Sequence, residues 1–424
     1  MMNWNRREFL WASAGLAVLP GMTASAEESA AIVSTDTVGA VLEPWQPGFL
    51  DIHHINTGRG NSALTIMPDG TSLLIDAGAS ATQGPAMNVV KPDASKRPGE
   101  WIAGYIQRQL TATGRPELDY ALLTHLHGDH VGDVRSENPK SAFGDYKRTG
   151  ISDVAEAIRI RRLIDRGFPD YNYPAAITDP AALNYAAFAR SVAKRGTVVE
   201  RMHVGSASQI ELQHAKSRYT EFGVRVLSGD GQVWTGQGEE SKLMFPPEVS
   251  VGPNPTSMEN SCSIALRIGY GKFSYFNGGD LNCDTNYGRD PWRDIETPAG
   301  RVSGPVSVST CNHHGYFDAT GPEFVKAVQP RVWILQSWHA SHPAISTLAN
   351  IYSPILYPGP RDVFCLSLNP ATELACARFS DSFKSKQGHV VVRVAPGGAE
   401  FRVMVLEDAD ESGRVKAVFG PYPS

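Results

Sequence analysis

The stretch T-H-L-H-G-D-H-V-G-D, residues 124–133, decides the fold of this 424-residue chain. It follows the apolar run 118–124, which predicts a buried strand. Four potential ligands fall within six positions: His125, His127, Asp129 and His130. A loop leaving the end of a strand can turn all four side chains into one pocket. Imidazole nitrogens and a carboxylate oxygen are ligands that Zn²⁺ prefers, and a catalytic zinc site keeps a position open for water. The stretch therefore predicts a metal site at the end of this strand.

The segments around this stretch predict a layered α/β protein. Short apolar runs separated by turns typical of adjoining strands precede it at 49–55, 62–67 and 72–78. Residues 101–113 carry apolar side chains at helical spacing and end in the stop signal T-G-R-P. After Cys262, strands alternate with helical stretches near 322–328 and 343–352. A strand-rich start and a strand–helix return favour an α/β sandwich.

Composition excludes several classes of protein. The chain is 42% hydrophobic and 20% charged, as in globular proteins, with a formal net charge of −5. No global basic field exists to hold nucleic acid or an anionic membrane, so we expect no stable partner of either kind. No apolar run of the length that spans a bilayer is present.

The N-terminus predicts export. Arg6 and Arg7, the apolar stretch 11–19 and the small residues 24–26 resemble a twin-arginine signal peptide covering residues 1–26. The alternative is a surface amphipathic helix. The resemblance implies the twin-arginine translocase as a partner during export, and a periplasmic or secreted protein. That compartment permits disulfides, and Cys365 and Cys376 flank a polar loop that a bridge between them could close.

The segment from about 132 to 257 predicts an insertion between two halves of one catalytic domain, which would run from 27 to 424. It carries helix-like stretches near 151–166 and 180–195. Four arginines lie in the first stretch: Arg159, Arg161, Arg162 and Arg166. They are interpreted either as an anion-binding run or as the solvated face of an amphipathic helix.

The H-x-H-x-D-H motif resembles that of the metallo-β-lactamase superfamily. Asp76, in L-L-I-D-A-G, matches the superfamily's structural aspartate that orients the histidine loop. Asp280, in F-N-G-G-D-L, matches the carboxylate that bridges or caps the metals. The resemblance spans about residues 50–400. It implies a four-layer αββα sandwich with a large insertion after the metal-binding motif.

A narrower resemblance is to the competence-protein (ComEC-like) branch, which includes secreted phosphocholine esterases. Four features of that branch occur in order: the G-x-G-[DN] turn at Gly58–Asn61, the N-x-x-S segment at Asn260–Ser263, His313-His314-Gly315, and His342-Pro343.

This resemblance implies a set of ligands, with one departure. Most di-zinc members supply a histidine shortly before the bridging aspartate, where this chain has Asn260. A first site formed by His125 and His127 is therefore expected to be short of ligands. The second site is expected to be complete, with Asp129, His130, Asp280 and His342. His314 is then left to assist the leaving group, whereas His313 is expected to be structural.

These features predict an exported metal-dependent hydrolase that uses a metal-activated water. The cofactor is expected to be one or two Zn²⁺ ions, with Mn²⁺ possible. Asp129 or Asp280 is the expected proton acceptor, and Asp129 and His314 are the expected catalytic residues. The ComEC-like resemblance favours a phosphodiester or phosphoester in a small molecule or surface polymer. Two alternatives stay open, a hydrolase of lactones or other carboxylic esters and a catalytically inactive binding protein.

Overall fold

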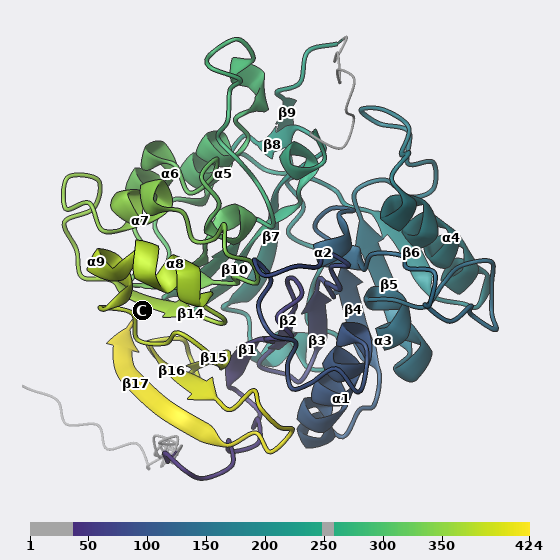
Figure 1. Ribbon diagram of the computed structural model, residues 1–424, viewed down its shortest axis with the longest axis horizontal. Coiled ribbons are helices and arrows are strands. Elements are labelled where there is room, and N and C mark those ends of the chain that lie inside the picture. Colours follow the sequence, from purple (N-terminus) through teal and green to yellow (C-terminus); the bar gives the residue numbers. More distant parts are fainter. Residues whose placement is uncertain (1–36, 248–257) are drawn as a thin grey trace, which may run out of the picture. The chain divides into compact units, whose positions relative to one another are not determined.

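The computed structural model describes residues 37–247 and 258–424, and two mixed β-sheets dominate it (Figure 1). The predicted signal peptide, residues 1–26, lies outside the described residues, so its assignment stays a prediction. Among the described helices, none is long and apolar enough to cross a membrane.

The first sheet has nine strands in the order β17-β16-β15-β1-β2-β3-β4-β5-β6. Their bounds are β1 Leu50–His54, β2 Ala63–Ile66, β3 Ser72–Ile75, β4 Leu118–Leu122, β5 Ile160–Asp165, β6 Val198–Arg201, β15 His389–Val394, β16 Glu400–Leu406 and β17 Val415–Pro423. The short turn 67–71 makes β2 and β3 antiparallel. The crossover through helix α1, Pro98–Leu110, makes β3 and β4 parallel, with Ile75 opposite Leu122.

The second sheet has eight strands in the order β14-β13-β12-β11-β10-β7-β8-β9. Their bounds are β7 Phe222–Gly229, β8 Gln232–Trp234, β9 Ser241–Leu243, β10 Ala265–Tyr270, β11 Phe273–Asn277, β12 Val308–Thr310, β13 Val332–Leu335 and β14 Asp362–Cys365. Strands β11 to β14 run parallel because helices connect them.

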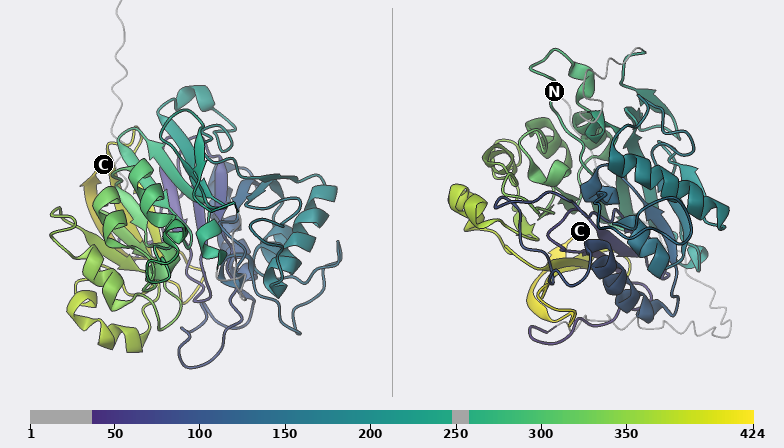
Figure 2. Two further views of the ribbon diagram at one scale, coloured as in Figure 1. Left: turned by 90° about the horizontal axis from the view of Figure 1, so that it is seen from above. Right: turned by 45° about the vertical axis from the view of Figure 1, so that its right-hand side comes forward.

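Helices cover the outer faces of both sheets (Figures 1 and 2). The helices are α1 Pro98–Leu110, α2 Gly128–Val131, α3 Ile151–Ala157, α4 Pro180–Lys194, α5 Glu296–Ser303, α6 Pro322–Val328, α7 Ile345–Ile351, α8 Pro370–Ala375 and α9 Ala377–Ser380. One apolar core, with Ile52 and Tyr275, fills the space between the sheets. A second packs α1, α3 and α4 on the first sheet, and a third packs α5, α6 and α7 on the other. The four-layer αββα expectation is therefore confirmed.

The segment 132–257 extends both sheets where the structure describes it. β5 and β6 continue the first sheet at one edge, and β7, β8 and β9 continue the second. The expected helix at 151–166 is wrong in its second half, where β5 pairs with β4. A short apolar run does not distinguish strand from helix by itself, and pairing with a neighbouring strand decides between them.

The cysteine prediction is also corrected. Cys365 and Cys376 are both free thiols in the structure. Cys365 ends strand β14, and the Cys376 sulfur lies 3.7 Å from the carbonyl oxygen of Pro343 instead.

Candidate metal centre

The predicted ligands gather at the carboxyl ends of parallel strands, where α/β sheets bind their ligands. Asp76 follows β3, and residues 124–130 follow β4. From the facing sheet, Asp280 follows β11, whereas His313 and His314 follow β12. Residues far apart in the sequence therefore meet because two sheets present the same ends of their strands.

Asp76 holds the histidine loop. Its carboxylate accepts the backbone N–H and the hydroxyl of Thr124, both at 2.8 Å, and lies 2.7 Å from Nδ1 of His130. The backbone of Asp76 has φ +60°. In residues other than glycine this conformation is strained, and it is found often at functional sites. Asp76 thus lies where the resemblance implied, and it directs Nε2 of His130 away from itself.

The G-x-G-N turn fixes the other side of the centre. A Cβ atom at Gly60 would collide with the backbone carbonyl of Asp129, so only glycine allows this approach. The N–H of Asn61 then donates to that carbonyl at 2.9 Å. The side-chain oxygen of Asn61 lies 3.0 Å from Nδ1 of His314 and orients that ring. The turn therefore positions one carboxylate and one imidazole together.

Two groups of side chains can hold a metal ion, and Asp280 belongs to both. The first group is His125, His127 and Asp280, and the second is Asp129, His130, Asp280 and His314. In the second group, Nε2 of His314 lies 2.8 Å from Asp129, and Nε2 of His130 lies 3.1 Å from Asp280. In the first, Nε2 of His125 lies 3.1 Å from Nδ1 of His127.

The donor set fits a divalent cation. Nε2 of His130 and Oδ1 of Asp280 are buried and face each other at 3.1 Å, but neither makes a hydrogen bond of normal geometry with the described residues. Such atoms cost free energy unless a ligand satisfies them. Nitrogen and carboxylate ligands in this number suit Zn²⁺, Mn²⁺ or iron and do not single out one of them. The residues present therefore fit a bound metal ion.

The pKa values of the buried carboxylates and imidazoles also indicate a site for a cation. Burial raises the pKa of Asp129 and Asp280, but the neighbouring imidazoles outweigh it and hold both pKa values below the usual range. Burial lowers the pKa of His314, but Asp280 and Asp129 raise it to about 9. The buried carboxylates thus stabilise protonated imidazoles. Protons and a metal ion therefore compete for the imidazole nitrogens of this centre.

The expectation for His342 is corrected by this geometry. His342 is in neither group, and its ring stacks on His314 with centroids 5.0 Å apart. Nδ1 of His342 faces the backbone N–H of Trp338 at 3.4 Å. His314 belongs to the second group instead, and both it and His313 adopt left-handed backbone conformations in the loop after β12. Sequence order alone could not choose between the two histidines.

His313 belongs to neither group but borders the centre. Its Nδ1 lies 2.6 Å from the carboxylate of Asp318, and its Nε2 lies 3.8 Å from Asp280. The side-chain nitrogen of Asn260 lies 3.2 Å from the same Nε2. A carboxylate that fixes one ring nitrogen and leaves the other facing a metal site is the usual support of a histidine ligand. His313 thus borders the first group on the side where Asn260 lies.

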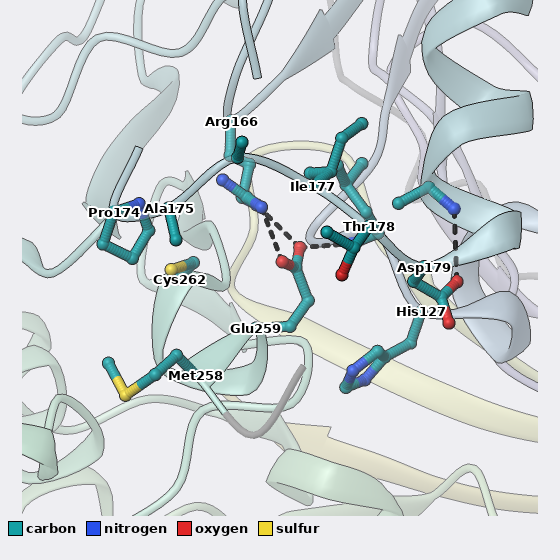
Figure 3. A pocket seen from close by; sticks show the side chains of 13 residues that line it. His127, Arg166, Pro174, Ala175, Ile177, Thr178, Asp179, Met258, Glu259 and Cys262 are labelled. Atoms are coloured by element: carbon teal, nitrogen blue, oxygen red, sulfur yellow. Dashed lines mark hydrogen bonds and ion pairs between the residues drawn. The ribbon is translucent and has the colours of Figure 1, made fainter. Parts of the chain in front are cut away.

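Sequence reasoning missed Glu259. Its carboxylate accepts the backbone N–H of Leu126, between the two histidines of the first group, at 2.8 Å. Arg166 holds that carboxylate through two bonds of 2.5 and 2.6 Å (Figure 3). In the sequence, the only feature that could have pointed to Glu259 is its position next to Asn260. Arg166 reaches it from the end of β5 in another part of the chain.

The arginine run is explained by pairing within the protein. Arg166 is buried against Glu259 and Asp230. Arg159 pairs with Glu117, and Arg162 pairs with Glu200. The solvated helix face is not present, because residues 160–165 form a strand.

Comparisons with known proteins find a family match for one segment of the chain. Residues 56–136 match the model of the metallo-beta-lactamase superfamily. No curated protein sequence matches the chain. Among solved structures, the chain is similar to CmlA, a diiron beta-hydroxylase from Streptomyces venezuelae, with 13% identity, a TM-score of 0.38 and coverage of 83% of this chain and 55% of CmlA. It therefore spans about half the length of CmlA.

A second similar structure is Zn²⁺-bound PqqB from Methylobacterium extorquens, with 11% identity and a TM-score of 0.33. That match covers 81% of this chain and 99% of PqqB. The family match contains Asp76 and the whole H-x-H-x-D-H motif, and the αββα layers surround it. The family match is thus limited to residues 56–136, which include Asp76 and the motif of four potential ligands.

Proposed function

We propose that this protein is a metal-dependent hydrolase whose substrate is a phosphodiester or phosphoester. The observation that carries the proposal is the sharing of Asp280 between two ligand groups that meet in one buried centre. When bound there, a divalent metal ion lowers the pKa of a water molecule and polarises a substrate oxygen.

The residues of the centre take distinct roles in this proposal. Asp280 is 1% exposed and lies between the groups, so it orients both ligand sets. Asp129 is the most exposed carboxylate of the centre, at 15%, and its Oδ2 faces Nε2 of His314. It is the group placed to hold the proton that the attacking water releases. His314 binds metal in this assignment and no longer assists the leaving group.

His313 completes the first group in this proposal. The sequence places Asn260 where most di-zinc members have a histidine, and Asn260 contacts His313. Nδ1 of His313 faces the carboxylate of Asp318, so Nε2, which lies 3.2 Å from the side-chain nitrogen of Asn260 and 3.8 Å from Asp280, is the nitrogen that would bind a metal ion in place of the contact with Asn260. The missing nitrogen ligand is thus supplied from the loop after β12.

The substrate class rests on the four features of the ComEC-like branch and on charge. The net charge of −5 disfavours long nucleic acid, which usually binds in a basic groove. A small molecule or surface polymer carrying the ester is therefore favoured. Export by the twin-arginine translocase to the periplasm or beyond belongs to the same proposal and rests on Arg6 and Arg7.

The test combines metal stoichiometry with turnover. The protein is purified without chelator, its metal is measured by elemental analysis, and it is assayed on bis-p-nitrophenyl phosphate, p-nitrophenyl phosphorylcholine and a chromogenic lactone. Bound metal with chelator-sensitive phosphodiester turnover is expected. Turnover of the lactone alone would transfer the proposal to carboxylic esters. Absence of both metal and turnover would leave a binding protein.

A further inference from the structure

A pocket beside the metal centre is not used by the chemistry above. Its enclosed space is about 30 Å³, and the empty space including its opening to solvent is about 430 Å³. His127 and Leu126 of the histidine loop form one side, and the loop 174–179 after β5 forms another (Figure 3). Because His127 belongs to the first ligand group, a molecule that occupies this pocket lies next to the centre.

The walls are mainly apolar. Carbon atoms are contributed by Leu126, Pro174, Ala175, Ile177, Ala182 and Met258. These side chains come from three separate segments, so the apolar character belongs to the assembled pocket and not to one apolar stretch. Burial of hydrocarbon against such walls is favourable by about 0.025 kcal/mol per Å².

The charged groups at the pocket are already paired. Arg166 is bonded to Glu259 and also faces Asp230 at 3.3 Å. The carboxylate of Asp179 accepts the N–H groups of Ala181 and Ala182 and caps helix α4. An anionic ligand would have to displace Glu259 from Arg166, whereas a neutral group needs no such exchange. The pairing therefore disfavours an anionic occupant and accepts an uncharged one.

We propose that this pocket binds a compact apolar group, alkyl or aryl, that the substrate carries next to the scissile ester bond. This inference rests on the proposed function and narrows its substrate class. The polar part of the substrate would then lie at the metal centre and the hydrocarbon beside His127. A substrate with charge on both sides of the ester is disfavoured.

The test is a chain-length series on the full, zinc-loaded protein. The substrates are p-nitrophenyl phosphodiesters with methyl, butyl and hexyl groups, and lactones with the same alkyl groups. We expect kcat/KM to rise about tenfold or more from the methyl to the butyl member, since each buried methylene contributes about fourfold.

In Ala175→Phe, which fills the pocket, the butyl-to-methyl ratio of kcat/KM should fall to about one. The matched control Ala112→Phe, at an exposed residue outside the pocket, should keep the wild-type ratio. A flat series in the wild-type protein, or a ratio that survives in folded Ala175→Phe, would overturn the inference.

A binding measurement separates this inference from the proposed function. Hexylphosphonate, which is not hydrolysed, should bind the zinc-loaded protein at least about tenfold more tightly than methylphosphonate in calorimetry. A diazirine at the end of the alkyl chain should label peptides containing residues 174–182 or 258–262. Labelling elsewhere would overturn the inference even if Ala175→Phe does not fold. Binding and labelling without turnover of any ester would keep the pocket and remove the hydrolase.

Discussion

The two ligand groups of the centre are supported to different degrees. In the second group, His130 is fixed by Asp76 and His314 is fixed by Asn61. In the first group, Nδ1 of His125 faces a neutral hydroxyl, that of Thr124, at 3.2 Å, and the position beside the group holds Asn260. Partners that fix the second nitrogen of a ligand raise metal affinity. The comparison therefore predicts one tightly held metal ion and one weaker one.

The largest effect should come from the residue that both groups share. Asp280→Ala should remove both metal ions and lower turnover by more than about a thousandfold, because several kcal/mol of charge stabilisation are lost. Elemental analysis and kcat measurement test this, with Asp284→Ala as an exposed control on the same loop. Full activity in Asp280→Ala, with the fold retained by circular dichroism, would remove the metal-hydrolase proposal.

The next effect distinguishes His314 from His342. His314→Ala should lose the tightly held metal ion, because it removes one of four ligands of the second group. His342→Ala should keep that metal ion, since its ring only stacks on His314. Metal titration with a chromogenic competitor measures both affinities. The opposite result would restore His342 as the ligand.

The support of the second group is tested by Asp76→Asn. An asparagine tolerates the left-handed backbone at this position but no longer carries the charge that faces His130. We expect metal affinity to fall by about ten- to a hundredfold, the usual effect of losing such a partner. An unchanged dissociation constant in the same competition assay would show that Asp76 only holds the loop.

The first group is tested by moving its proposed third nitrogen ligand from residue 313 to residue 260. His313→Ala should lower the stoichiometry from two metal ions to one, because the weaker site loses a ligand. Adding Asn260→His to that variant should restore the second ion, since residue 260 lies beside the removed ring. Elemental analysis after desalting gives the count. Two ions in His313→Ala itself would contradict the assignment of His313.

The smallest effect on metal is expected at Glu259→Gln. A glutamine at this position can still accept a hydrogen bond from the N–H of Leu126. It has no negative charge, so its interaction with the guanidinium of Arg166 is weaker. Loss of a charge-assisted hydrogen bond should lower the free energy of unfolding by about 2 kcal/mol. Urea unfolding measures this, while the tight metal ion should be retained. Loss of that ion would mean that Glu259 supports both groups.

The sequence by itself determined the layers and most of the ligands. The H-x-H-x-D-H motif, Asp76 and Asp280 are recognisable because their spacing within single loops is set by local chemistry. The apolar periods likewise predicted β1 to β4 and α6. The exception was residues 160–165, where an ambiguous apolar run became a strand through pairing with β4.

Only the tertiary structure decided which residues meet across the two sheets. The choice of His314 over His342 depends on a left-handed turn after β12, and the Arg166–Glu259 pair joins residues 93 positions apart. The apolar pocket is assembled from three segments of the chain. No period or motif encodes such contacts, because they depend on how the strands are ordered in space and on which side chains the packing turns inward.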